Sequence, residues 1–291
     1  QGPIRLMEFI MSPSLIKPAD YHIKMLEDKE YLLKTALLYH KTSLFPSKYD
    51  PNGVAMPETL GKYGALLEMS RSATLQNSIR KAYSACYFFL IWWNFPYYQQ
   101  RPSRKRILSV DLWRIFDKAF NLARDYRQER LSSIDLTDDD FKRRLEEVFG
   151  FMKRSDSIGS TGASKALHIL NPELFPLWDD SIRKGFGLRE DAPSYIKFME
   201  ILQAISRRLD EKSILGEHVE MLGVEPAPEV LEPLTKILDE SNFIVLTKAR
   251  FHTKPIPVNE VRAAVEDLHK LLESDIKGVS LEKEIGKILV K

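Results

Sequence analysis

Residues 158–188 read IGSTGASKALHILNPELFPLWDDSIRKGFGL, and the order of turn and helix signals in this stretch decides the fold. A short turn rich in serine and glycine covers 155–161. A helix is expected from about 162 to 170, where an Asn-Pro pair ends it, because the residue before a proline disfavours helical backbone. Another helix is expected to begin at Asp179, since a carboxylate stabilises the first turn of a helix. The stretch therefore predicts two short helices joined by a brief connection.

The helical pattern continues on both sides of this stretch. Upstream, acidic residues with a capping hydroxyl at 137–140 predict a helix start, and apolar residues at helical spacing follow from Phe141 to Met152. This helix and the one at 162–170 form a helical hairpin. A long irregular loop is expected at 41–61. Further helices are expected at 17–40, 75–95, 110–126, from a capping Ser194 onward, and at 258–274.

The fold class that follows is mainly α. One run, 243–246, is β-like, but no pattern along the chain is typical of a sheet. The chain contains no internal repeat that would indicate a solenoid.

The composition is that of an ordinary globular protein. Lys and Arg total 43 and Asp and Glu total 41, so the net charge is +2, which excludes a uniformly basic DNA-coating protein but permits a local basic face. Apolar residues make up 44% of the chain, which argues against a disordered protein. The single cysteine, Cys86, excludes an intrachain disulfide and fits a reducing compartment. The most apolar stretch, 82–98, is shorter than the ~20 residues of a membrane span, so we expect a cytoplasmic protein with no membrane partner.

Three segments are distinguished along the chain. Residues 1–3, Gln-Gly-Pro, are interpreted as the remnant of a protease cleavage site and are left out of the fold. Residues 4–230 are predicted to form the main helical unit, with the hairpin and the candidate site at 137–188. A looser stretch with three prolines at 216–233 indicates a boundary. Residues 231–291 are predicted to be a C-terminal helical extension that packs on the same unit.

The candidate site contains an amine and a carboxylate on neighbouring helices. Lys165 is expected in the first turn of its helix, where the positive end of the helix dipole disfavours a cation. Its amine should therefore lose its proton more readily than the amine of an exposed lysine. Gly159 and Gly162 leave room for a phosphate to approach the backbone N–H groups of the helix start. The sequence thus offers Lys165 as a candidate nucleophile and Asp179 as a candidate carboxylate.

This segment resembles the core of the helix-hairpin-helix DNA glycosylases, in particular the lysine-dependent 8-oxoguanine branch and its archaeal form. The resemblance covers 137–188 and rests on the hairpin glycines, on Lys165 and on the Pro-Leu-Trp-Asp run that ends at Asp179. Two features differ from the family pattern. The hairpin reads Gly-Ser-Thr-Gly instead of Gly-x-Gly, and the spacing from Lys165 to Asp179 is roughly one helical turn shorter than is usual.

The resemblance implies a fold and an activity. The fold would be two-lobed and helical, with a helix-hairpin-helix element and a cleft between the lobes. The activity would be base-excision repair, in which an 8-oxoguanine-like damaged base is removed from double-stranded DNA. Lys165 would be the nucleophile, Asp179 would orient it, and an abasic-site lyase step would follow. No metal and no cofactor are implied, and a monomer associated with the nucleoid is expected.

Further residues are predicted to contact the substrate. They are Gly159, Ser160, Thr161, Gly162, His168, Trp178, Asp180 and Arg183. Asp180 competes with Asp179 for the catalytic role, because a shift of one residue exchanges them. His168 and Trp178 are equally consistent with core packing, and Arg183 is a phosphate contact only if the glycosylase interpretation holds.

Two other functions stay open. A non-catalytic helical nucleic-acid-binding protein would use the hairpin for phosphate contact, and it would show salt-sensitive DNA binding without base release. A helical partner-binding protein would use the Gly-Ser-Thr turn only as a helix cap, and it would show no affinity for DNA at low salt.

Overall fold

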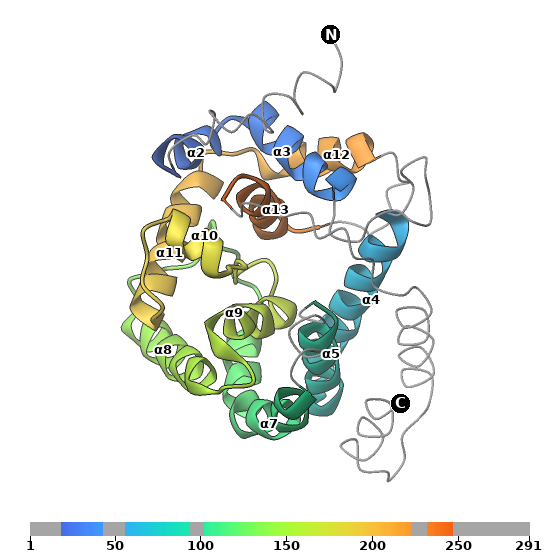
Figure 1. Ribbon diagram of the computed structural model, residues 1–291, viewed down its shortest axis with the longest axis vertical. Coiled ribbons are helices and arrows are strands. Elements are labelled where there is room, and N and C mark those ends of the chain that lie inside the picture. Colours follow the sequence, from blue (N-terminus) through green and yellow to red (C-terminus); the bar gives the residue numbers. More distant parts are fainter. Residues whose placement is uncertain (1–18, 43–55, 94–101, 223–231, 247–291) are drawn as a thin grey trace.

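The chain folds as an assembly of helices, which confirms the expected mainly α class (Figure 1). The computed structural model describes residues 19–42, 56–93, 102–222 and 232–246, and within these ranges every regular element is an α-helix. In chain order the helices are α2 (Ala19–Met25), α3 (Lys29–Thr42), α4 (Met56–Leu75), α5 (Ile79–Trp93), α7 (Pro102–Asp125), α8 (Asp139–Arg154), α9 (Gly159–Leu170), α10 (Asp180–Gly185), α11 (Ala192–Ser206), α12 (Glu211–Leu222) and α13 (Leu234–Leu246).

Three boundaries expected in the first half of the chain are wrong, and one is the start of the helix expected at 110–126, which begins at Pro102 as α7. The expected loop at 41–61 includes 56–61, which form the first turns of α4. Pro57 is compatible with this start, because a proline in the first helical turn lacks only an N–H that has no intrahelical partner. The helix expected at 75–95 starts later, as α5, because a turn at Asn77 separates it from α4. The backbone of Asn77 is in the left-handed region, with φ at 52°.

Aspartates, and not the expected hydroxyl residues, start two of the helices. Asp138, and not Thr137, caps α8, because its side chain accepts hydrogen bonds from two backbone N–H groups of the first turn. Asp191 caps α11, because its side chain accepts a hydrogen bond from the backbone N–H of Ser194. Ser194 itself had been expected as the cap. An ionised carboxylate is favoured at both positions, since it also interacts with the helix dipole.

The β-like run at 243–246 is helical and forms the last turn of α13. Intrinsic β-propensity is weak, and here it is overridden because the preceding residues form a buried helix. The expected helix at 258–274 lies outside the described residues.

Helix α9, which carries Lys165, packs against α4, α5, α7 and α8 (Figure 1). Helix α5 supplies the most apolar surface of this group, and from Ala82 to Ile91 nearly all of its side chains are buried. Among the described helices, none combines the length and the apolar character that a membrane crossing requires. The surroundings of α9 are thus a packed protein core.

Helix α13 is the second element that positions the site. It packs against α3, α10 and α12. Two hydrogen bonds fix it to the first helices, from His22 Nε2 to Asn242 Oδ1 at 3.0 Å and between the hydroxyls of Thr35 and Ser241 at 2.6 Å. The described part of the predicted extension is therefore integral to the core, while the segment limits at 230 and 231 stay predictions.

Candidate functional site

Helices α8 and α9 are the two helices from which the sequence predicted a helical hairpin. They pack against each other, and residues 155–158 join them. Gly159 opens α9 with φ at +65°, a backbone region that glycine enters without steric cost. The helix therefore begins at Gly159 and not near Gly162, and Ser160 and Thr161 lie in its first turn.

Lys165 is buried within α9, with 8% of its surface exposed. Burial lowers the pKa of its amine to about 8, against the opposing charges of Asp179 and Asp239. A lowered pKa was expected from the sequence, but with the helix dipole as its cause. Because α9 starts at Gly159, Lys165 lies beyond the first turn, where the dipole effect has faded. Loss of hydration is thus the main cause.

Hydrogen bonds join the residues that directly precede Lys165 and Asp179. The hydroxyl of Ser164 donates to the carbonyl of Trp178 at 3.1 Å, and the N–H of Trp178 lies 3.3 Å from the same hydroxyl oxygen. The indole N–H of Trp178 donates to the carbonyl of Ser160 at 3.3 Å. Ser164 precedes Lys165 and Trp178 precedes Asp179, so these bonds hold the two helices in register at the site. Asp179 is accordingly the carboxylate that most raises the pKa of Lys165.

Asp179 is also the N-cap of α10. Its Oδ1 accepts a hydrogen bond from the N–H of Ile182 at 2.8 Å, and the side chain is half-buried. The capping role, which the sequence left as an alternative, is therefore present. It is compatible with a second role, because a carboxylate has two oxygens and the cap uses one of them.

Helix α13 adds a second buried lysine and further carboxylates to this pair. Lys236 Nζ donates to Glu240 Oε1 at 2.8 Å and to Asp239 Oδ2 at 3.5 Å. Burial raises the pKa of Asp239 to about 6; Lys236 opposes the shift, and Glu240 and Asp179 add to it. Lys165 also acts on the pKa of Asp239. Lys165 on α9, Asp179 at the start of α10 and the charged groups of α13 are therefore close enough to influence one another's pKa.

The α13 residues were missed at the level of sequence. Lys236, Asp239 and Glu240 stand at positions i, i+3 and i+4 and share one helix face. The sequence signal that could have found them is a group of charged residues on one face of an otherwise apolar helix. The β-like interpretation of 243–246 concealed it.

The hairpin glycines serve local packing. Gly162 is buried, and a Cβ placed there would lie 2.7 Å from Ile158 Cγ2, so the turn can close only around a glycine. Ser160 is also buried and donates to Glu190 Oε1 at 2.7 Å. Gly159 and Thr161 are partly exposed, and they are the two of the four predicted hairpin residues that offer surface to a ligand.

His168 lies in the core, in agreement with the simpler of its two interpretations. Its Nδ1 is 2.7 Å from the carbonyl of Phe175, and its Nε2 is 2.6 Å from the hydroxyl of Tyr63. A carbonyl can only accept, so Nδ1 carries the proton and Nε2 accepts from Tyr63. Burial lowers the pKa of His168 to about 3, so the ring is neutral at physiological pH.

Trp178 is 1% exposed and packs edge-on against Phe149 and Tyr195. Its indole holds α9 and the start of α10 together, so its observed role is packing.

Asp180 and Arg183 form an ion pair within α10. The carboxylate of Asp180 accepts from Arg183 Nη2 at 2.6 Å and from Lys184 Nζ at 2.7 Å. Arg183 Nη1 donates to the carbonyl of Leu188 at 3.0 Å, which joins α10 to the segment that follows it. Asp180 therefore pairs within α10, whereas Asp179 is the carboxylate whose charge most raises the pKa of Lys165.

Comparison with known proteins adds no relative: no family model, no curated protein and no solved structure matches the chain. The function therefore has to be inferred from the site itself.

Proposed function

We propose that the protein is a DNA repair glycosylase with abasic-site lyase activity, in which Lys165 is the nucleophile and Asp179 its partner. The observation that carries the proposal is that a buried amine with a pKa of about 8 lies within electrostatic reach of a carboxylate on the adjoining helix. An amine attacks carbon only in its neutral form, and a pKa near 8 supplies a useful neutral fraction at physiological pH. The resemblance of residues 137–188 to the lysine-dependent glycosylases supports the same roles.

The chemistry runs in two stages. The neutral amine of Lys165 attacks C1′ of the damaged nucleotide, the N–C1′ bond forms, and the base leaves with the electron pair of the broken glycosidic bond and takes up a proton. Asp179 accepts a proton from the attacking amine and stabilises positive charge on the sugar. The sugar ring then opens to a Schiff base. Loss of a C2′ proton expels the 3′ phosphate by β-elimination, and water releases the enzyme.

The substrate class is proposed from the resemblance to the lysine-dependent 8-oxoguanine glycosylases. The partner is double-stranded DNA with an oxidised base of the 8-oxoguanine type, and the base is flipped out of the duplex at a cost of a few kcal/mol. Because Lys165 is only 8% exposed, the side chains around it have to part before a sugar can reach the amine. We propose that α9 and α13 face a cleft between two lobes, and that a monomer acts on nucleoid DNA.

Borohydride trapping tests the proposal. The protein is incubated with duplexes that carry 8-oxoguanine, uracil or an abasic site, and borohydride is added to reduce any Schiff base. A covalent protein–DNA band is expected on the 8-oxoguanine and abasic duplexes. Lys165→Ala should abolish the band, while Lys197→Ala, which removes an exposed lysine on α11, should leave it unchanged. A band that survives Lys165→Ala would assign the chemistry to another amine.

Two variants of Asp179 separate its chemical role from its cap. Asparagine caps a helix about as well as aspartate but carries no charge, so Asp179→Asn should keep α10 folded and still slow trapping. Asp179→Ala removes both roles. If Asp179→Asn traps DNA at the wild-type rate, the carboxylate is only a cap.

The alternative function has a distinct outcome in the same experiment. The partly exposed Gly159 and Thr161 at the start of α9 are compatible with phosphate contact that needs no chemistry. Salt-sensitive DNA binding with no band on any duplex and no released base would indicate the non-catalytic nucleic-acid-binding protein.

A further inference from the structure

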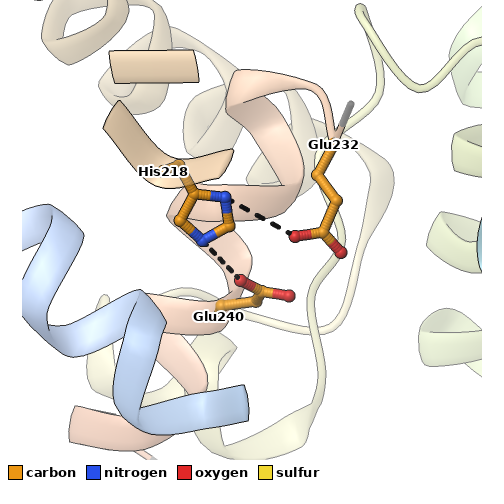
Figure 2. A group of neighbouring side chains, drawn as sticks. All are labelled: His218, Glu232 and Glu240. Atoms are coloured by element: carbon orange, nitrogen blue, oxygen red, sulfur yellow. Dashed lines mark ion pairs between the residues drawn. The ribbon is translucent and has the colours of Figure 1, made fainter. Parts of the chain in front are cut away.

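Three buried side chains from two helices and the segment between them converge beside the site. His218 lies on α12, Glu232 lies just before α13, and Glu240 lies on α13 (Figure 2). They are 1%, 5% and 0% exposed. One ring nitrogen of His218 and one oxygen of each carboxylate lie within 4.8 Å of one another. Their spacing along the sequence matches no common metal-binding motif, which is why no metal was expected from the sequence.

The distances between these side chains suit ligands of a common ion. His218 Nδ1 lies 3.9 Å from Glu232 Oε2, and its Nε2 lies 3.9 Å from Glu240 Oε2. Both separations exceed the ~2.7–3.2 Å of an N–H···O hydrogen bond. Two ligands bound at ~2.1 Å to one ion lie about 3.4 Å apart in a tetrahedral arrangement and at most about 4.2 Å apart. Because an ion takes one ring nitrogen and the ligand atoms lie up to 4.8 Å from one another, the side chains have to close in by up to about 1.4 Å to reach the tetrahedral separation, a shift within the reach of side-chain torsions.

The buried charges around the cluster favour a dication. Glu232, Asp239 and Glu240 are three buried carboxylates, and Lys236 is the buried ammonium that bonds two of them. In their ionised forms these four groups carry three negative charges and one positive charge, an excess of two. Burying net negative charge is expensive, so a cation bound among these carboxylates is strongly stabilised.

We propose that His218, Glu232 and Glu240 bind a divalent transition-metal ion, with zinc as the ion of best fit. One imidazole nitrogen and two carboxylate oxygens are borderline ligands that zinc and manganese accept, whereas magnesium and calcium prefer oxygen ligands alone. A water molecule completes a four-coordinate shell. Lys236 bonds Glu240 Oε1 and leaves Oε2 directed at His218, so it orients the ligand in the way that outer partners of metal ligands do.

The ion would act as a clamp between α12 and α13. Its ligands come from both helices and from the segment that leads into α13, and all three side chains are buried. The proposal is independent of the glycosylase proposal, because the clamp stabilises the fold whether or not Lys165 reacts with DNA.

Metal titration of the whole chain tests the clamp. The protein is treated with EDTA, dialysed, and titrated with zinc chloride by calorimetry, with metal content measured by mass spectrometry. We expect about one tightly bound zinc ion per chain and a melting temperature that rises on addition of zinc. His218→Gln and Glu232→Gln should each weaken zinc binding at least about tenfold. Glu220→Gln, which removes an exposed carboxylate from α12, should leave the affinity unchanged.

A spectroscopic readout keeps the test decisive if a variant fails to fold. Cobalt replaces zinc in such sites, and the wild-type protein loaded with cobalt should show the intense visible absorption of a four-coordinate ion. The proposal is overturned if the folded wild-type protein takes up neither metal. It is also overturned if the variants bind zinc as tightly as the wild type, or if the cobalt spectrum is that of a six-coordinate ion on the surface.

Discussion

Lys165 and Lys236 are both buried in the same site, and their amines have opposite pKa shifts. Burial lowers the pKa of Lys165 to about 8, and the positive charge of Lys236 contributes to that decrease. Burial acts in the same direction on Lys236, but the carboxylates around it, Glu240 first, hold its pKa well above the usual range. The amine of Lys165 therefore loses its proton readily. The amine of Lys236 stays protonated, and its positive charge helps to lower the pKa of Lys165.

The rate of Schiff-base trapping should depend on pH in a way that reports Lys165. Only the neutral amine reacts, so the rate should rise with pH and level off above about 8, the pKa of Lys165. Asp179 raises that pKa, so Asp179→Asn should move the midpoint of the profile to lower pH even though it reduces the maximal rate. A midpoint that stays in place, measured with a pre-formed abasic duplex, would show that Asp179 does not act on the amine.

Replacing Lys236 should destabilise the fold strongly. Lys236→Met keeps most of the side-chain volume but leaves Glu240 and Asp239 without their cation, which costs about 3–5 kcal/mol in buried pairs. Lys197→Met on the exposed surface of α11 serves as control and should change the free energy of unfolding by less than about 0.5 kcal/mol. Urea denaturation of both variants gives the comparison. Similar midpoints for the two variants would contradict the assigned ion pairs.

Stability should fall as the pH falls below about 6.5, because two histidines are buried in the neutral form. Burial lowers the pKa of His168 to about 3 and that of His22 to about 4, whereas in the unfolded chain both take up a proton near pH 6.5. The unfolded state therefore binds more protons in this window. Each histidine costs about 1.4 kcal/mol per pH unit as the pH drops, and the cost ends at its folded-state pKa.

Thermal melting between about pH 7.5 and 4.5 measures this slope. His168→Gln should flatten it, because only one of the two buried histidines then contributes. An equal slope in wild type and variant would mean that His168 does not stay neutral in the folded protein.

Two glycines of the hairpin should respond in opposite directions to alanine. Gly162→Ala places a Cβ 2.7 Å from Ile158 Cγ2, and overpacking of this kind costs about 1–3 kcal/mol. Gly150 lies inside α8, and a Cβ at this position would have no neighbour within 4 Å, so Gly150→Ala should stabilise the protein by about 0.5–1 kcal/mol. Chemical denaturation of the pair provides an internal control. Equal effects would show that the contact with Ile158 does not restrict Gly162.

Features that depend on short-range pattern were predicted from the sequence. The apolar spacing from Phe141 to Met152 located α8, and the Asn-Pro pair after Leu170 located the end of α9. The caps were misplaced by one to three residues. A hydroxyl and a nearby carboxylate compete for the same backbone N–H groups, and the sequence does not show which of the two side chains accepts the hydrogen bond. In the structure Asp138 and Asp191 make these contacts.

The site was predicted only in the part that is local in sequence. Lys165 and Asp179 are joined by a short connection, so their positions on neighbouring helices followed from the local pattern, and their roles stay a prediction. The contribution of α13 depends on packing between segments that are distant in the chain. In particular, the burial of Lys236 and Glu240 is decided by contacts with α3 and α12, which no local pattern encodes.

The hydrogen bond between His22 and Asn242 joins residues that are 220 positions apart. A ribosome makes α2 and α3 early and α13 late, so the first helices emerge well before the helix they pack against. Until that helix is synthesised, the face of α3 that packs against it is exposed to chaperones and to non-native contacts. The synthesis of α13 therefore sets the earliest time at which α2 and α3 can complete their packing. Slowing translation ahead of the codon for Leu234 would lengthen that exposed interval.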